Sequence, residues 1–418
     1  MTARPEHQID AAFMPLFDSA VLIAAREIGF AEREGVDLVL HRETSWANIR
    51  DRIAIGHFDI AHMLGPMPIA CNLGLTPLTS DTIVPFALGV GGNCVTVSNP
   101  VWEGMADHGA VPDLDPETAG RALGGLVRQR TAAGKEPLRL GVVHPHSGHY
   151  YELCYWLAAC GIDPLRDIEI VIVPPPFMAD ALAAGRLDGY CVGEPWNSLS
   201  VARGIGHIAT VKAKIWRNSP EKVVGVRKAF ADERPDALAA MLRALHQSAR
   251  WCQDPANRDD LALLMAQPRF LGVPPALQMP ILTGRLTVGD GVDLSVADFF
   301  LPFDKGANFP WKSHALWLYT QMVRWGQVAH TPKNEAAARD TYRPDLYRAA
   351  LKPLGVALPG ANAKVEGALA GPTPVGSAGA SLVLGPDGFF DGGVFDPDRV
   401  DAYVVAQAAR GGDQNPGR

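Results

Sequence analysis

Three histidines, His144, His146 and His149, stand within six positions of the segment VVHPHSGHYY, which spans residues 142–151. Imidazole nitrogens can bind a metal ion, accept a proton in catalysis or donate a hydrogen bond to an anion. Pro145 restricts how the three rings can converge, so we expect no metal site here. A surface or helix-capping histidine and an anion-binding histidine stay open as alternatives.

The position of His149 favours an anion donor. The apolar run 138–144 predicts a strand, and a helix is expected to begin near Gly148. Ligands of open α/β sheets bind beyond the carboxyl ends of the strands, where helix N-termini offer free backbone N–H groups. His149 lies at such a junction.

Four other residues take equivalent positions at element ends: Trp46, Asn93, Gly193 and Lys222. Trp46 begins the helix after the second strand, and Gly193 ends a strand. Each also has an ordinary interpretation, since Trp46 could be a core aromatic, Asn93 a turn residue and Lys222 a solvated lysine. Lys222 is the only cation among these candidates, and none of them completes a known catalytic motif, so we expect neither an enzyme nor a cofactor.

The elements that position these residues alternate in type, which predicts an α/β fold with mainly parallel sheets. A chain of 418 residues is long enough for two lobes with a cleft between them. From residue 331 the Gly-, Pro- and Ala-rich sequence predicts an irregular extension. Strands are expected at 9–13, 36–43, 59–64, 138–144, 168–174, 188–193 and 222–230, and helices at 16–35, 45–56, 148–161, 176–186 and 232–253.

Composition argues against two classes of function. The net charge is −7, whereas nucleic-acid-binding proteins present a basic face, so we expect no direct nucleic-acid binding. The longest uncharged stretch, 82–102, contains the prolines and glycines of strands and turns, so no membrane span is expected.

The N-terminus and the cysteines indicate the compartment. The segment MTARPEHQIDAAF lacks the apolar region of a signal peptide. Six widely spaced cysteines without a C-x-x-C pair are typical of reduced, buried thiols. We therefore expect a cytoplasmic protein.

Several segments together resemble the nitrate-binding proteins of bacterial nitrate and bicarbonate ABC importers. They are SWANIRDRIAIGHFDIAHMLGPMP, GGNCVTV, SGHYYELCYWLAACGIDP, VVPPPFM, YCVGEPWN and SPEKVVGVR, and the resemblance covers about residues 9–330. It implies a two-lobed periplasmic-binding-protein-like fold of type II, with the ligand in a cleft between the lobes. Lobe 1 would comprise residues 1–95 and 215–330, lobe 2 residues 96–214, and a C-terminal extension wrapping the lobes residues 331–418.

The resemblance also implies a ligand site. The family's oxyanion contacts correspond to Trp46, Asn93, His149, Gly193 and Lys222, with Asn93 standing where the transporters carry glutamine. The bicarbonate-binding relatives carry an acidic residue in place of Lys222, so this chain is expected to bind nitrate or nitrite.

Within the resemblance, the expected cytoplasmic location implies one branch, the nitrate/nitrite sensors of the NasS type. Such a sensor, when free of its anion, sequesters an RNA-binding antiterminator of the NasT type. Two alternatives remain: the binding component of an ABC-type nitrate transporter, and an enzyme of the same fold such as a thiamine-precursor synthase. The enzyme requires a reactive lysine or a cysteine pair with cofactor contacts, which the sequence does not indicate.

Overall fold

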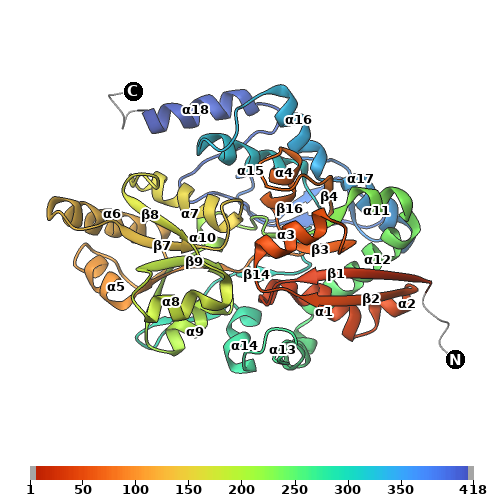
Figure 1. The fold of residues 1–418 in the computed structure, drawn as a ribbon, viewed down its shortest axis with the longest axis horizontal. Coiled ribbons are helices and arrows are strands. Elements are labelled where there is room, and N and C mark those ends of the chain that lie inside the picture. The colour runs from red at the N-terminus through yellow and green to blue at the C-terminus, as the bar shows by residue number, and fades with distance from the viewer. Residues whose placement is uncertain (1–5, 413–418) are drawn as a thin grey trace.

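Two five-stranded sheets form the cores of two lobes that lie side by side (Figure 1). The structure is a computed structural model and describes residues 6–412. The first sheet has the strand order β2-β1-β3-β11-β4, and the second has the order β10-β6-β9-β7-β8. These two sheets confirm the expected two-lobed α/β architecture.

The first sheet combines parallel and antiparallel strands. β1 pairs in parallel with β2 and β3, whereas β11 runs antiparallel to both β3 and β4. Its strands are β1 (His7–Phe13), β2 (Val36–Arg42), β3 (Ile60–Leu64), β4 (Thr82–Ala87) and β11 (Lys222–Arg227).

The second sheet repeats this plan. β7 pairs in parallel with β8 and β9, and β6 runs antiparallel to β9 and β10. Its strands are β6 (Asn93–Ser98), β7 (Leu138–Val142), β8 (Ile168–Ile172), β9 (Gly189–Gly193) and β10 (Gly206–Val211).

The expectation of mainly parallel sheets is wrong for β11 and β6. Each of these strands enters its sheet just after the chain has crossed from the other lobe, without the helical crossover that makes neighbouring strands parallel. The chain crosses between β4 and β6 and returns between β10 and β11. The expected lobe boundaries stay predictions. The first of them, between residues 95 and 96, falls inside β6.

Helices connect and cover the sheets (Figure 1). Those that follow strands of the first sheet are α1 (Ala20–Glu27), α2 (Phe30–Arg33), α3 (Trp46–Ala54), α4 (Pro66–Asn72), α11 (Lys228–Glu233), α12 (Pro235–Gln253) and α13 (Arg258–Met265), with the short 3-10 helix η1 (Phe17–Ser19) before α1. Those of the second lobe are α5 (Asn99–Ala106), α6 (Pro116–Ala132), α7 (Gly148–Ala159), α8 (Met178–Ala183), α9 (Trp196–Ala202) and α10 (Lys212–Ile215).

The rest of the chain links the two lobes and forms the C-terminal part. Its elements are β5 (Val90–Gly91), α14 (Pro275–Thr283), β12 (Arg285–Gly289), β13 (Val292–Ser295), β14 (Phe300–Leu301), α15 (Lys312–Arg324), α16 (Pro332–Thr341), α17 (Pro344–Leu351), β15 (Leu358–Pro359), β16 (Thr373–Val375), β17 (Ser377–Ala378), β18 (Leu382–Leu384) and α18 (Val400–Gly412).

The expectation of an irregular C-terminal extension is wrong for α16 and α17. Both helices begin with proline at the first helical position, where its missing N–H costs nothing. α16 packs against α4 and α15, and α17 packs against α12 and β4, so both helices belong to the first lobe. The segment between α17 and α18 contains only two-residue and three-residue strands and a short 3-10 turn, as the sequence predicts.

Aromatic contacts attach this segment to the body. The ring of Phe389 stacks on the ring of Trp216 with centroids 4.5 Å apart, and Trp317 packs against the same indole. All three side chains are buried. They hold the C-terminal segment over the end of the second lobe.

The cysteines and the apolar stretch 82–102 agree with expectation. All six cysteines are free, and five of them are buried. The stretch 82–102 forms β4, β5, β6 and the start of α5. Among the described residues, none of the helices combines the length and apolarity that a membrane span requires.

Candidate oxyanion-binding site

Trp46 and His149 each lie in the first turn of a helix that follows a strand. Trp46 is the first residue of α3, His149 is the second residue of α7, and both are buried. The side chains of Ser45 and Ser147 cap these helices by accepting a hydrogen bond from the backbone N–H three residues later. The caps hold both helix starts at the junction between the lobes.

Asn93 and Gly193 are neighbours on adjacent strands of the second sheet. Asn93 begins β6, Gly193 ends β9, and the two are paired in the ladder. A Cβ on Gly193 would lie 3.3 Å from Asn93 Oδ1 and 3.5 Å from Asp18 Oδ2. A larger residue would therefore crowd the space between Asn93 and the first lobe.

Lys222 begins β11 in the first lobe and is 1% exposed. Its Nζ lies 2.9 Å from Asp18 Oδ2 and donates a hydrogen bond to Glu221 Oε1 at 2.6 Å. It also stands 5.8 Å from the centre of the Trp46 ring. Burial would lower the pKa of Lys222, but the carboxylates of Asp18 and Glu221 raise it above its ordinary value, so the lysine stays cationic.

Glu221 connects the two lobes at the centre of this cluster. Its Oε2 accepts hydrogen bonds from Asn93 Nδ2 at 2.6 Å and from Lys212 Nζ at 2.5 Å. Its Oε1, bonded to Lys222, also lies 3.7 Å from His149 Nε2. Burial would raise the pKa of Glu221, but the two lysines hold it well below its ordinary value.

Lys212, the first residue of α10, is a second buried cation of the cluster besides Lys222, which is the only cation among the five predicted residues. Lys212 Nζ contacts Glu152 Oε1 at 2.6 Å and donates to the Pro220 carbonyl at 2.6 Å, besides its bond to Glu221. Burial raises the pKa of Glu152 to about 7 although Lys212 lowers it. Glu152 therefore keeps its proton to a higher pH than an ordinary glutamate.

His149 is held in its neutral form. Burial and the neighbouring charge of Lys222 lower its pKa to about 3. Among the described residues, neither ring nitrogen has a hydrogen-bond partner, and the same is true of Trp46 Nε1. One imidazole N–H and one indole N–H at the lobe junction are therefore available to donate to an oxyanion.

Asp18 links the cluster to the core of the first lobe. Its Oδ1 lies 3.0 Å from His62 Nε2, while His62 Nδ1 accepts a hydrogen bond from the Met14 N–H at 3.3 Å. The His62 ring packs edge-on against Trp46, with ring centres 5.2 Å apart. Burial would raise the pKa of Asp18, but Lys222 and His62 lower it, so this carboxylate is ionised.

The structure thus brings all five sequence-predicted residues together, and their role as anion ligands stays a prediction. The sequence reasoning missed four charged residues: Asp18, Glu152, Lys212 and Glu221. A signal was present, because Asp18 and Glu152 are single charges inside apolar helical segments, where a buried charge requires a partner. Their partners lie far away in sequence and could not be read from it.

His144 and His146 do not join His149. The backbone N–H of His146 donates to His144 Nδ1 at 3.0 Å, and His146 Nδ1 lies 3.2 Å from the Tyr151 hydroxyl. His144 Nε2 lies 3.5 Å from an Arg50 nitrogen. The ring nitrogens of His144 and His146 thus have partners of their own, and the three histidines do not point at one metal-sized position.

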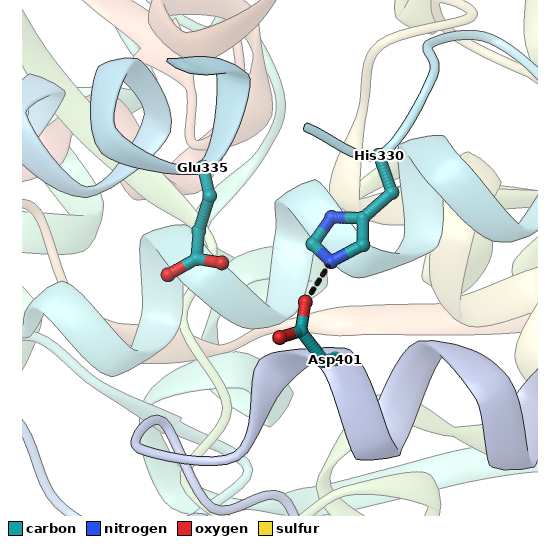
Figure 2. A group of neighbouring side chains, drawn as sticks. All are labelled: His330, Glu335 and Asp401. Carbon is teal, nitrogen blue, oxygen red and sulfur yellow. Dashed lines mark hydrogen bonds and ion pairs between the residues drawn. The ribbon is translucent and has the colours of Figure 1, made fainter. Parts of the chain in front are cut away.

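Another group, His330, Glu335 and Asp401, brings three potential metal-ligand atoms within 4.8 Å of one another (Figure 2). His330 Nε2 contacts Asp401 Oδ1 at 2.6 Å, in the first turn of α18. Glu335 pairs with Arg339, whose positive charge opposes a bound cation. We interpret the contact between His330 and Asp401 as a hydrogen bond that holds α18 to the connection between α15 and α16.

We therefore expect purified protein to contain no stoichiometric zinc by elemental analysis, and chelation to leave anion binding unchanged. One tightly held metal per chain that is lost in His149→Ala would contradict this for the histidine segment. Loss of that metal in His330→Ala would instead place it at the C-terminal helix.

Two sheet-centred lobes with a buried charged cluster between them define the periplasmic-binding-protein fold, type II. The chain belongs to the NMT1-like family, whose model matches residues 2–266. The family and the fold that the sequence resemblance implied are confirmed, whereas the sensor branch stays a prediction.

Two relatives and one solved structure match the chain over most of its length. The chain is 33% identical over 405 residues to the nitrate/nitrite binding protein NrtA of Synechococcus elongatus, covering 95% of this chain and 85% of the relative. It is 30% identical over 418 residues to the bicarbonate-binding protein CmpA of the same organism, with 95% and 85% covered. The crystal structure of the periplasmic nitrate-binding protein NrtA from Synechocystis superposes with a TM-score of 0.83 at 25% identity, covering 97% of this chain and all of that one.

Proposed function

We propose that the chain binds nitrate or nitrite at the cluster around Lys222 and serves as the binding component of an ABC-type importer. One observation carries the proposal: a buried cation and hydrogen-bond donors from both lobes meet at one point, in a chain similar over most of its length to NrtA. The names of the relatives support the import role better than the sensor role expected from the sequence.

The donor set suits a small oxyanion. Lys222 supplies a charge-assisted donor, and Asn93, neutral His149 and Trp46 can supply N–H groups. The capped N-terminus of α7 adds backbone N–H groups beside His149. Because Lys222 comes from the first lobe and His149 from the second, an anion that binds both would favour lobe closure.

Titration calorimetry of the purified protein with nitrate, nitrite and bicarbonate tests the proposal. We expect one site per chain for nitrate or nitrite, with bicarbonate bound about tenfold more weakly or worse. A protein that binds bicarbonate more tightly, or none of the three anions, would refute it.

The second candidate is the cytoplasmic sensor, which uses the same cluster. If an antiterminator of the NasT type binds the open, anion-free state of the lobes, nitrate must weaken that complex by the factor by which the antiterminator weakens nitrate binding. Size-exclusion chromatography of the two proteins with and without nitrate distinguishes the candidates. A complex that nitrate dissociates supports the sensor, and the absence of a complex leaves the import role.

A further inference from the structure

The carboxylate of Glu221 lies on the donors that the proposed oxyanion needs. Its Oε1 accepts from Lys222 at 2.6 Å and lies 3.7 Å from His149 Nε2. Its Oε2 accepts from Asn93 at 2.6 Å. Two of the five predicted anion contacts, Asn93 and Lys222, thus already donate to a side chain of the protein itself, and His149 lies beside it.

The shape of the site fits a planar carboxylate. A Cβ on Gly148, the first residue of α7, would lie 2.7 Å from Glu221 Oε2. The missing side chain at Gly148 therefore lets the carboxylate reach the start of α7, where backbone N–H groups favour negative charge. A carboxylate and nitrate are both planar, carry one negative charge and accept hydrogen bonds through oxygen.

The negative charge of Glu221 opposes the binding of a second anion to the same donors. Lys212 and Lys222 provide two positive charges, while Asp18, Glu152 and Glu221 provide three carboxyl groups. All five groups are at least 91% buried, so water screens them little. An oxyanion placed on Lys222 and Asn93 while Glu221 is still there would face a like charge on the same donors.

We propose that Glu221 is a specificity-determining residue that competes with the external oxyanion: the anion binds by displacing the Glu221 carboxylate from Asn93 and Lys222. This inference rests on the proposed function and names the residue that limits affinity at that site. A tethered competitor has a high effective concentration, so only anions that use several of these donors at once displace it.

Calorimetry with nitrate on wild type, Glu221→Gln and Glu152→Gln tests the proposal. Glu221→Gln keeps the size of the side chain but removes its charge, and we expect nitrate affinity to rise about tenfold or more. Glu152→Gln is the matched control, because Glu152 contacts Lys212 from α7 and has no hydrogen bond to Asn93 or Lys222 among the described residues. Its effect should be several-fold smaller.

Glu221→Asp distinguishes competition for the donors from the effect of a changed net charge in the cluster. It also provides a second test if Glu221→Gln folds poorly. Aspartate keeps the charge but is shorter by one methylene, so it is expected to release Asn93 and also to tighten nitrate binding. Wild-type affinity in Glu221→Asp, or weaker binding in folded Glu221→Gln, would overturn the competition. Absence of nitrate and nitrite binding in wild type and in every variant would instead refute the proposed function itself.

Discussion

Replacing Lys222 with glutamate is expected to abolish nitrate binding and to lower the free energy of unfolding by about 3–5 kcal/mol. In the wild type, Lys222 Nζ lies between the carboxylates of Asp18 and Glu221, at 2.9 and 2.6 Å. A glutamate would place a carboxylate beside these two in a site that water does not screen, and it would repel an incoming anion. Titration calorimetry measures the first effect, and urea unfolding followed by circular dichroism measures the second.

Lys228→Glu is the matched control. Lys228 directly follows β11, its side chain is 46% exposed, and it pairs with Asp232 one helical turn later. Such surface pairs contribute about 1 kcal/mol or less, so this variant should keep its stability and its nitrate binding. Micromolar nitrate binding that survives in Lys222→Glu would contradict the assignment of the site.

Lys212→Met is expected to lower the free energy of unfolding by about 3–5 kcal/mol at pH 8, because it leaves Glu221 and Glu152 buried without their shared cation. The loss should be smaller at pH 5. Glu152 has a folded-state pKa of about 7, above its ordinary value of 4.5, so its ionisation costs stability as pH rises through that range. Removing Lys212, which lowers this pKa, makes ionisation more costly.

Urea unfolding of both proteins at pH 5 and pH 8 measures this difference. Buried histidines such as His149 change the pH dependence in the opposite direction, but they are present in both proteins and largely cancel. Lys214→Met serves as the control, because Lys214 lies on the surface of α10 and its Nζ donates to the exposed backbone carbonyl of Asp113. A Lys212→Met defect that is equal at both pH values would show that the carboxylates are not its cause.

Local pattern predicted most of the elements around the site. Apolar runs predict β1, β3, β7, β9 and β11, and a serine, Ser45, caps α3 at the start of its helical pattern. The apolar pattern does not predict a helix whose buried residues are small or polar. α16 buries only Ala338 and Thr341, so its sequence was indistinguishable from a polar tail. Strand direction in β6 and β11 depends on the crossing of the chain between lobes, which periodicity does not encode.

Only part of the site could be predicted, because the sequence indicates where strands and helices end but not which side chains pair. Strand ends and helix starts converge between the lobes by topology, which is why Trp46, His149 and Lys222 could be placed together. The charge pairs depend on which side chains of each lobe meet at the junction. Asp18 meets Lys222 from the first lobe, and Glu152 meets Lys212 within the second, from segments distant in sequence.

The most direct test of the oxyanion site is a crystal structure of the protein grown with nitrate at saturating concentration. The site described here predicts one nitrate between the lobes, with its oxygens within hydrogen-bond distance of Lys222 Nζ, Asn93 Nδ2 and a ring nitrogen of His149, next to the Gly193 backbone. Nitrate bound elsewhere on the molecule, with the contacts of Lys222 and Glu221 unchanged, would contradict it.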